Sequence, residues 1–404
     1  MSHFGFTEEQ EMFRQEVRRF ARKELAPTAL QRSQPDADFE LIMQVMTKVM
    51  EQGWSKINYP EKYGGCPLDH VFLGILCEEL EKVDMTAGVI PFFSAFNGLN
   101  LKYLPEEAQD EIIPPLINMT AFTARGYTEA NSGNEFPTIR TKAVRDGDYY
   151  VINGEKQPAS MAMFATHIII SCKTDTECPG HEGMSMFVIP RDTPGMTLSP
   201  LPFMVGPFGM PKQDPRFGGG QAIVSLDDCR VPAKYLLGEE GDGYRQQNES
   251  YNFARIYGIL IASLAWAQHS LQHTIEYARE RIRFGRPIIQ FEGVSFKIAE
   301  HYTNIEAARF LAYQAMWTKD QGRDNTKETS MAKLFGVGAA RRAIHDCLMI
   351  CGYAAFSSEH WMQELMRGII GMDIADGTEQ MQKLIILREL IGPEALPSGM
   401  SDKF

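Results

Sequence analysis

The order of hydrophobic patterns along the chain predicts an α+β fold in which a small β domain lies between two helical regions. Apolar residues recur at helical spacing first, then in short strand-like runs, and again at helical spacing from about Glu239 to the end. With 404 residues, the chain is too long for one small core. We therefore expect an N-terminal helical domain (1–120), a central β domain (121–236) and a C-terminal helical domain (237–404).

The N-terminal domain carries recognisable helix signals. Thr7 and Gln10 have the spacing of a capping box, in which both side chains satisfy free amides of the first helical turn. Apolar residues then recur at helical spacing as far as Leu25, and we expect Pro27 to end this helix. Further helical patterns cover 39–52, 68–83 and 107–118, and a turn-rich segment, 54–65, interrupts them.

The central domain begins with a hairpin signal. The segment 142–152 reads as two strands joined by an Asp146-Gly147 turn. Three more strand candidates follow, separated by loops rich in glycine and proline: 167–172, 184–189 and 221–226.

Composition limits the function. The formal net charge of −12 argues against binding to nucleic acids or anionic membranes. The most apolar stretch, 256–267, is too short and too polar to span a bilayer. The first residues lack a basic start followed by an apolar run, and the seven cysteines show no pairing or zinc-binding spacing. We expect a cytoplasmic protein with reduced thiols, no membrane or nucleic-acid partner, and no metal site.

Two further segments stand out for their glycine and arginine residues. Gly133 lies in the loop 127–135, where a residue without a Cβ lets backbone amides and small hydroxyls approach a polar ring edge. Farther along, Arg281 and its neighbours stand at the end of a helical pattern, just before Phe284-Gly285. A guanidinium group offers a rigid fork of donors and keeps its charge, which suits a pyrophosphate.

These segments, with three others, resemble the flavin-dependent acyl-CoA dehydrogenase family in the same order along nearly the whole chain. The most specific match is Tyr277–Ile288, which is similar to the family's Tyr-Ala-x-x-Arg-x-x-Phe-Gly-x-Pro-Ile. The other matching segments are 60–65, 127–135, 153–160 and 376–380. The resemblance implies N-terminal helices, a β-barrel-like central domain and a C-terminal four-helix bundle.

The resemblance also implies FAD as the cofactor and assigns residues to it. Arg281 would reach the FAD pyrophosphate of a neighbouring subunit, so we expect a homodimer or homotetramer. The residues that the resemblance places at FAD are Tyr127, Thr128, Gly133, Pro158, Ser160, Arg281, Phe284, Phe291, Glu292, Gly352, Thr378 and Gln380. Those that it places at the acyl-CoA substrate are Asn134, Arg255 and Gly377.

Several positions depart from the family pattern. Pro158 replaces an aromatic residue that packs beside the flavin, and Glu292 replaces a glutamine. Asn134 replaces a serine, and Gly352 is the one glycine kept from a Gly-Gly pair. These departures leave the shielding of the flavin and its electron acceptor open.

Asp376 matches the catalytic base, which in most of the family is a glutamate that abstracts the substrate's α-proton. It precedes Gly377-Thr378 at the start of a helical segment, and it is one methylene shorter than glutamate. An Asp-Gly turn that bonds its own backbone is the purely structural interpretation. Some family members take the base from a Glu-Arg pair, but the corresponding residues here are Ala254-Arg255, and Glu249 lies farther back.

The function implied is α,β-desaturation of an acyl-CoA, with an electron-transfer flavoprotein as oxidant of the reduced flavin. The shortened acid suggests a cyclic or otherwise atypical acyl group, by analogy with relatives that carry aspartate. Two alternatives stay open. One is a flavin oxidase of the same fold that acts on a non-CoA carbon acid, and the other is a non-catalytic subunit of a mixed oligomer.

Overall fold

The computed structural model describes residues 5–32, 39–84, 87–178, 180–201, 221–357 and 360–396. The chain divides into two compact units, each made of segments that are far apart in sequence. The helical unit comprises Met1–Gln52, Leu68–Phe92 and Asn252–Leu390. The sheet unit comprises Gly53–Pro67, Phe93–Tyr251 and Ile391–Phe404.

The N-terminal helices start as the sequence predicts. The capping box is present, because Thr7 Oγ1 accepts from the Gln10 amide at 3.2 Å and Gln10 Oε1 accepts from the Thr7 amide at 3.0 Å. Pro27 does not end the helix. It lies in α2, and the helical backbone runs through it without a break from α1 and the π-helical segment that follows α1. The helices and the π-helical segment η1 are α1 (Glu8–Phe20), η1 (Ala21–Leu25), α2 (Ala26–Arg32), α3 (Phe39–Glu51), α4 (His70–Glu81) and α5 (Val89–Gly98).

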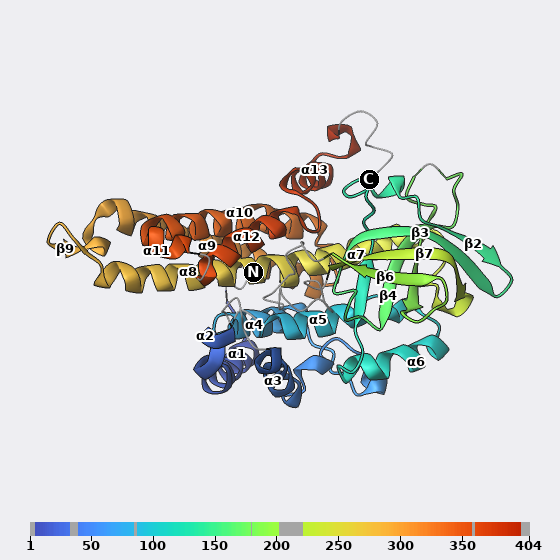
Figure 1. The fold of residues 1–404 in the computed structure, drawn as a ribbon, viewed down its shortest axis with the longest axis horizontal. Coiled ribbons are helices and arrows are strands. Elements are labelled where there is room, and N and C mark those ends of the chain that lie inside the picture. Colours follow the sequence, from blue (N-terminus) through green and yellow to red (C-terminus); the bar gives the residue numbers. More distant parts are fainter. Residues whose placement is uncertain are drawn as a thin grey trace. The chain divides into compact units, whose positions relative to one another are not determined.

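The C-terminal half of the helical unit is built on three long helices, α8, α9 and α10, which pack side by side (Figure 1). Their buried faces carry many alanines, which allow close helix approach. Ahead of α8 the chain forms a second π-helical segment, η8. The elements are η8 (Arg255–Leu260), α8 (Ile261–Glu280), α9 (Glu292–Asp320), α10 (Thr326–Cys351), α11 (Tyr353–Phe356), α12 (Trp361–Ile374) and α13 (Glu379–Leu390).

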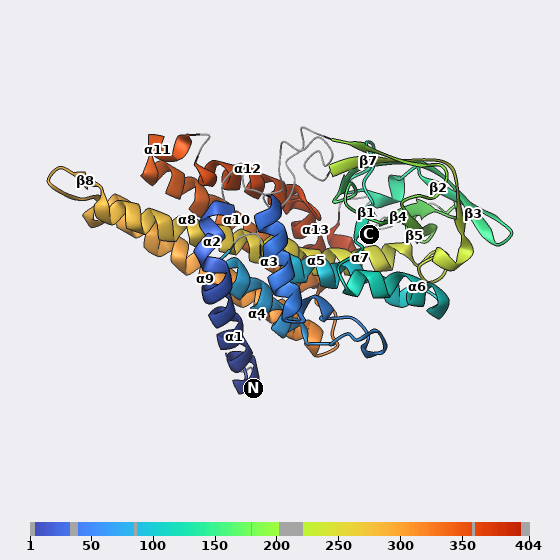
Figure 2. The same ribbon diagram turned by 60° about the horizontal axis from the view of Figure 1, so that its bottom comes forward.

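A short hairpin joins α8 to α9 at the far end of these helices (Figure 2). Its strands are β8 (Ile282–Arg283) and β9 (Arg286–Pro287), followed by the 3₁₀ turn η9 (Ile288–Gln290). Phe284 and Gly285 form the turn with φ of 50° and 81°. Two consecutive residues with positive φ are typical of a tight hairpin turn.

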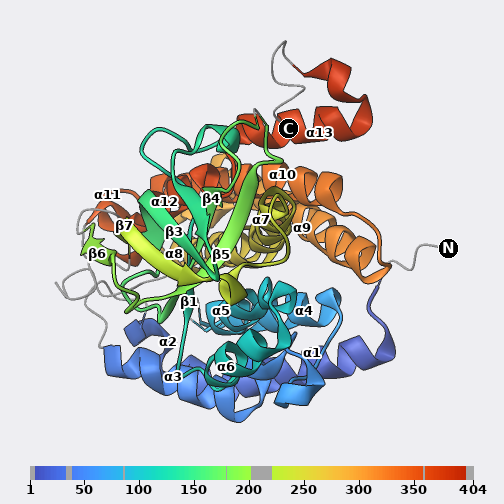
Figure 3. The same cartoon turned by 90° about the vertical axis from the view of Figure 1, so that its right-hand side faces the viewer.

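The sheet unit contains a curled sheet (Figure 3). Within the described residues it has seven strands in the order β1-β4-β2-β3-β7-β6, and β5 pairs with β4. β1 pairs with β4 in parallel, while the β2–β3, β3–β7, β4–β5 and β6–β7 pairs are antiparallel. The strands are β1 (Thr123–Gly126), β2 (Lys142–Asp146), β3 (Tyr149–Ser160), β4 (His167–Lys173), β5 (Met184–Pro190), β6 (Met196–Pro200) and β7 (Gln221–Pro232).

The sheet unit's remaining elements flank these strands in sequence. Two are α-helices, α6 (Glu106–Ile117) and α7 (Gly243–Ala254). Six are 3₁₀ turns, namely η2 (Trp54–Lys56), η3 (Glu61–Tyr63), η4 (Leu101–Tyr103), η5 (Phe136–Thr138), η7 (Ala233–Tyr235) and η10 (Pro393–Ala395).

The helix–strand–helix order confirms the α+β prediction, and β2–β3 confirms the predicted hairpin. β7 is longer than expected, because it runs on from Leu226 to Pro232 beside β3. The predictions omitted β1, β6 and α5. None of the helices in the described ranges is both long and apolar enough to cross a membrane.

Candidate active site

Asp376 lies on a tight turn between α12 and α13, in the helical unit. Its φ is 53° and that of Gly377 is 93°, so two consecutive residues adopt the left-handed region. Aspartate is among the few side chains that tolerate this conformation. Two features of the turn require glycine at position 377. Besides its φ, a Cβ there would lie 2.9 Å from Gln382 Nε2.

Three buried side chains hold the carbonyls of this turn. Arg255 Nε donates to Asp376 O at 2.8 Å, and Gln382 Nε2 donates to Gly377 O at 2.8 Å. Lys333 Nζ donates to Gly377 O at 2.5 Å and also to Ala375 O. We call Arg255, Lys333 and Gln382 the turn clamp, and they come from η8, α10 and α13. Each is at most 5% exposed, so the turn is fixed from within the helical unit.

The electrostatics of the turn favour a basic carboxylate. Burial raises the pKa of Asp376, although the cations Lys333 and Arg255 work in the opposite direction. Burial also lowers the pKa of Lys333 to about 8, against the pull of the Asp376 charge. A carboxylate whose pKa is raised binds a proton more readily, as a general base requires.

The structure places four other residues named in the sequence analysis as follows. Arg255 donates hydrogen bonds through two nitrogens. Nε bonds Asp376 O, and Nη1 bonds Asn252 Oδ1 at 3.1 Å. Thr378 O accepts from the Gln382 amide at 3.0 Å, and Gln380 is exposed on the first turn of α13. Glu249 belongs to the sheet unit, where it bonds Lys102 Nζ at 2.5 Å and Tyr103 Oη at 2.8 Å.

The β8–β9 hairpin exposes both charge and an aromatic side chain. Arg281 ends α8 and is exposed, and Phe284 is 93% exposed at the tip. Phe284 contacts the edge of Phe291 with ring centroids 6.3 Å apart, and the Arg286 guanidinium lies 4.1 Å from the Phe291 centroid. Glu292 opens α9 and is exposed. Exposed guanidinium groups beside aromatic rings suit a phosphate ligand brought by another molecule.

Gly352 lies apart from the hairpin residues in sequence and ends α10 with φ 70° and ψ −145°. Nothing lies within 4 Å of a Cβ built there. The conformation alone therefore favours glycine at this position.

In the sheet unit, a buried ion pair ties the loop 127–135 to β3. Lys156 Nζ donates to Glu129 Oε1 at 2.8 Å and to Tyr127 O at 3.2 Å. The Glu129 carboxylate also accepts from the Arg140 and Thr141 amides at 2.6 and 3.0 Å. Burial works against its charge, but Lys156 and these donors hold the pKa of Glu129 below its usual range.

The expected flavin contacts of this loop differ in exposure. Tyr127 is buried, with Oη 3.3 Å from Ser250 Oγ, so its side chain packs inside the unit. Thr128 is half-buried, and its carbonyl accepts from the Gln157 amide at 2.9 Å. Gly133 and Asn134 are exposed.

Pro158 and Ser160 lie on β3, where the pairing with β7 is irregular between Lys156 and Ala159. Both residues are exposed. Ser160 Oγ is 2.9 Å from Gln221 Nε2, which fixes the hydroxyl at the end of the strand. An exposed proline offers less cover to a flat ring than the aromatic side chain it replaces.

The residues of the sheet unit fit the polar edge of a flavin ring. Gly133 does not have a positive φ, and a Cβ there would meet nothing within 4 Å. Neither backbone strain nor packing within the chain therefore requires glycine, whereas a flat ligand approaching the backbone would. Thr128 and Ser160 add hydroxyls, and Arg281 of the helical unit offers the charge that a pyrophosphate needs.

The sequence did not single out Lys333, Gln382, Glu129 or Lys156 as functional residues. Lys333 is a lysine on a helix face otherwise made of small and apolar residues, which is the one signal it gave. Glu129 and Lys156 lie inside matched motifs, but nothing in the sequence links them to each other.

No three His, Cys, Asp or Glu side chains gather into a potential metal site in the part of the chain that the structure describes. The helical unit carries one carboxylate on a clamped turn and exposed arginines, and the sheet unit carries glycine-bearing polar loops. Arginines and glycine-bearing loops of this kind suit a cofactor that combines a pyrophosphate with a flat polar ring.

Comparisons with known proteins identify the family. Residues 7–120 match the acyl-CoA dehydrogenase N-terminal domain, 124–218 the middle domain and 241–391 the C-terminal domain. The probable acyl-CoA dehydrogenase YngJ of Bacillus subtilis (strain 168) is 34% identical over 96% of this chain and 100% of its own length. Cyclohexane-1-carbonyl-CoA dehydrogenase of Geobacter metallireducens is 28% identical over 96% of this chain and 99% of its own length.

Solved structures agree. Butyryl-CoA dehydrogenase from Megasphaera elsdenii superposes with a TM-score of 0.83 at 28% identity, covering 96% of this chain and all of that one. The FAD complex of PigA gives a TM-score of 0.84 at 25% identity, covering 97% of this chain and all of that one. The chain belongs to the acyl-CoA dehydrogenase family and has its fold, with N-terminal helices, a central curled sheet and a C-terminal helical bundle. It is an oxidoreductase that acts on CH–CH bonds, with FAD as cofactor.

Proposed function

We propose that this protein desaturates an acyl-CoA thioester between its α and β carbons, with Asp376 as the base. Asp376 takes the α-proton, the β-carbon gives up a hydride, and a carbon–carbon double bond forms between them. Bound FAD supplies the hydride acceptor. The observation that carries the proposal is the turn clamp, which holds a carboxylate of raised pKa on a rigid turn.

Residues of the sheet unit and the hairpin would hold the cofactor. Thr128, Gly133 and Ser160 would meet the ring edge, with Tyr127 packed beneath and Pro158 beside it. Arg281, with Phe284, Phe291 and Glu292, would meet the FAD of a neighbouring subunit, and Gly352, Thr378 and Gln380 would complete the site. The exposed Arg281 and Phe284 support this proposal.

The substrate we propose is an acyl group with a substituted α-carbon, such as an alicyclic ring. Aspartate is one methylene shorter than glutamate and leaves room for the extra carbon on the α position. The similarity to cyclohexane-1-carbonyl-CoA dehydrogenase supports the same choice. Asn134, Arg255 and Gly377 remain the proposed substrate contacts. For Arg255 the contact would be indirect, since its side chain already bonds the turn.

The reaction and substrate are tested by anaerobic bleaching of the flavin against a panel of acyl-CoAs. The panel contains butyryl-, octanoyl-, isobutyryl- and cyclohexane-1-carbonyl-CoA. We expect bleaching, fastest with the branched or alicyclic members. Faster bleaching by the straight-chain members would refute the substrate proposal, and absence of bleaching with FAD bound would refute the reaction.

The role of Asp376 is tested by Asp376→Asn, which keeps the shape of the side chain and removes its basicity. We expect flavin reduction to slow by about 10³-fold, within the range for loss of a general base. FAD content should stay at the wild-type level. A variant that keeps wild-type turnover would show that another group removes the proton.

A flavin oxidase of the same fold is the second candidate, favoured by the exposed Pro158 at a position that is aromatic in the family. We propose an electron-transfer flavoprotein as the oxidant instead. Reoxidation by that carrier, with little oxygen consumption in its absence, is the expected result. Rapid oxygen consumption without the carrier would establish the oxidase, and a purified protein without bound flavin would indicate a non-catalytic subunit.

A further inference from the structure

Lys333 is a buried lysine whose position calls for an explanation. It is 2% exposed on α10, among small and apolar neighbours that include Ala332, Gly336 and Val337. Burying an ammonium group is costly unless it is paired and hydrogen-bonded. Lys333 meets this need with the carbonyls of Ala375 and Gly377, the two residues on either side of Asp376.

The two carbonyls converge on one ammonium group, and this contact constrains the residue between them. Asp376 and Gly377 both have positive φ, a conformation that an isolated turn would readily leave. The Ala375 carbonyl belongs to the peptide plane before Asp376 and the Gly377 carbonyl to the plane after Gly377, so Nζ ties both ends of the Asp376-Gly377 step. Arg255 holds the plane between them through Asp376 O. The direction of the Asp376 Cα–Cβ bond is therefore fixed as well.

The aspartate makes this constraint more important than it would be for glutamate. Its side chain has one torsion fewer, so the carboxylate cannot recover its position by rotating about an additional bond. The backbone alone must place it. Misplacement by about 1 Å can cost a reaction on the order of 10²-fold.

We infer that Lys333 is a positioning residue that holds the Asp376 turn in the geometry needed for proton abstraction. The inference rests on the proposed role of Asp376 as base. Lys333 does not touch the substrate in this scheme, and it acts through the backbone of the turn. Arg255 and Gln382 support the carbonyls of Asp376 and Gly377, whereas Lys333 alone among the clamp residues bonds Ala375.

The test compares Lys333→Met and Lys333→Gln with wild type as FAD-loaded enzymes. Methionine keeps the length and removes both donation and charge, while glutamine keeps a shorter donor. We expect kcat to fall at least tenfold for Lys333→Met, with KM within about twofold and FAD content unchanged. The matched control is Lys327→Met on the same helix, where a partly exposed lysine pairs with Glu328 at 3.4 Å and should be replaceable without effect.

Two further readouts separate positioning from general destabilisation. Backbone amides of the turn 375–378 should exchange hydrogen for deuterium faster in Lys333→Met, with or without substrate. The amides of α10, which carries Lys333, should keep their protection. The acidic limb of the kcat profile should also move to higher pH, because the ammonium favours the ionised Asp376. The other charged groups that act on Lys333 are Arg255 and Asp373, and both remain in the variant.

A Lys333→Met enzyme with wild-type kcat and wild-type amide exchange would overturn the inference. If Lys333→Met does not fold, Lys333→Leu decides, because it also removes the donor, and wild-type kcat with wild-type amide exchange there overturns the inference equally. Partial recovery of kcat in Lys333→Gln is the result that donation to the turn predicts. Failure of the base proposal would look different. Asp376→Asn would then retain turnover whatever the Lys333 variants do.

Discussion

Apart from Arg255, the side chains that hold the Asp376 turn and the loop 127–135 are distinct from those expected to touch ligands. Lys156 is fully buried and reaches Glu129, whose carboxylate in turn ties down the amides of Arg140 and Thr141. This single pair fixes the loop that carries Thr128 and Gly133 to the strand that carries Ser160. The ion pair therefore sets how the proposed flavin contacts of the sheet unit are arranged.

Breaking this ion pair should release the cofactor before it unfolds the chain. Glu129→Gln leaves Lys156 buried without its counter-charge, which is expected to cost about 3 kcal/mol locally. We expect the FAD-to-protein ratio after gel filtration to fall by at least half. Lys142→Met, on the exposed face of β2, is the control and should keep its FAD. Full FAD retention by Glu129→Gln would show that the pair does not organise the site.

For single residues, the sequence could indicate candidates that have a local pattern, but not the contacts between residues that are far apart in the chain. Asp376 could be recognised because its Gly-Thr neighbours and its place before a helix are local features. Lys333 and Arg255 act on Asp376 from 43 and 121 residues away, and such a contact leaves no local pattern. Arg255 is expected at the substrate, and the structure shows that its side chain bonds the Asp376 turn.

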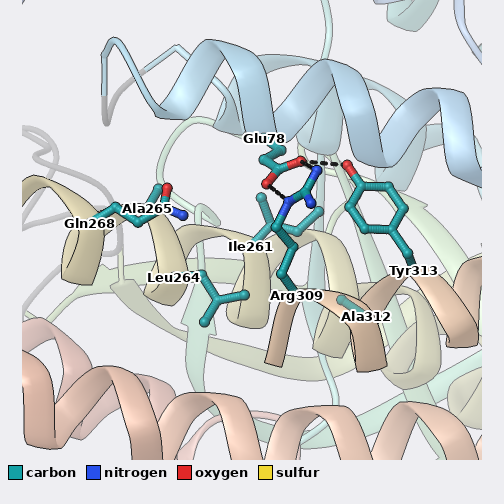
Figure 4. Close-up of a pocket in the computed structure, with 8 residues that line it drawn as sticks. All are labelled: Glu78, Ile261, Leu264, Ala265, Gln268, Arg309, Ala312 and Tyr313. Carbon is teal, nitrogen blue, oxygen red and sulfur yellow. Dashed lines mark hydrogen bonds and ion pairs between the residues drawn. The ribbon is translucent and has the colours of Figure 1, made fainter. Parts of the chain in front are cut away.

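Among the elements, α4 carries an unusual row of acids. Glu78, Glu79 and Glu81 are all buried on it, and Asp84 follows just after its end. Figure 4 shows Arg309 and Tyr313 both directed at the Glu78 carboxylate, with Tyr313 Oη 2.6 Å and Arg309 Nη2 3.0 Å from Glu78 Oε2. The cavity beside them is about 10 Å³, which holds at most about one water molecule and no acyl group. These acids serve the packing of the helical unit.

Glu79 should stabilise the protein at neutral pH. Burial disfavours its charge, but Arg18 and Arg14, which bond it at 2.8 and 3.1 Å, lower the pKa of Glu79 to about 2. A carboxyl group with a depressed pKa stabilises the fold at pH values above its pKa in the unfolded chain, which is about 4.5. This stabilisation is lost as the pH falls towards 2. Glu79→Gln should therefore cost about 3 kcal/mol at pH 7 and progressively less between pH 4 and pH 2. Urea titrations at each pH measure this difference, and a loss independent of pH would contradict it.

Glu81, in contrast, should lower the stability of the protein at neutral and higher pH. Burial, and the charge of Asp84, raise the pKa of Glu81 well above its usual range, and its Oε2 has no hydrogen-bond partner among the described residues. A raised carboxyl pKa lowers stability as pH rises above about 4.5, because the unfolded chain releases the proton. Glu81→Gln mimics the protonated acid and should raise the unfolding free energy at pH 8, on the order of 1 kcal/mol. The gain should vanish near pH 4. A loss of stability at pH 8 would show that the carboxylate is paired.

The predictable elements were those with a long, regular period. The long helices and the β2–β3 hairpin fall into this group, because amphipathic spacing and an Asp-Gly turn are local signals. η1 and η8 could not be predicted, since a π-helical segment has the same apolar spacing as the α-helices around it. β1 and β6, of four and five residues, are too short for a period to emerge.

For the whole molecule, the exposed apolar residues of the helical unit point to assembly. Phe284 is 93%, Tyr353 87% and Phe356 69% exposed. Aromatic side chains this exposed, when they gather, mark a surface that another molecule covers. We propose that a second copy of this chain covers this surface, since Arg281, on the same hairpin as Phe284, would reach that copy's FAD.

Charge placed on the hairpin should therefore affect assembly and cofactor together. We expect Phe284→Asp to shift native mass spectra towards monomer and to lower the FAD content, most clearly on dilution. Met12→Asp is the control, because Met12 is also 66% exposed but lies on α1. Unchanged mass and FAD content in Phe284→Asp would refute the role of the hairpin.

The proposed desaturation depends on removal of the α-proton of an acyl-CoA by Asp376. The most direct measurement is deuterium incorporation at that carbon when FAD-loaded enzyme is incubated anaerobically in D₂O with the acyl-CoA that bleaches its flavin fastest. We expect wild-type enzyme to exchange the α-proton, and Asp376→Asn with full FAD to do so at least 10²-fold more slowly. Exchange at the wild-type rate in Asp376→Asn would contradict this role of Asp376.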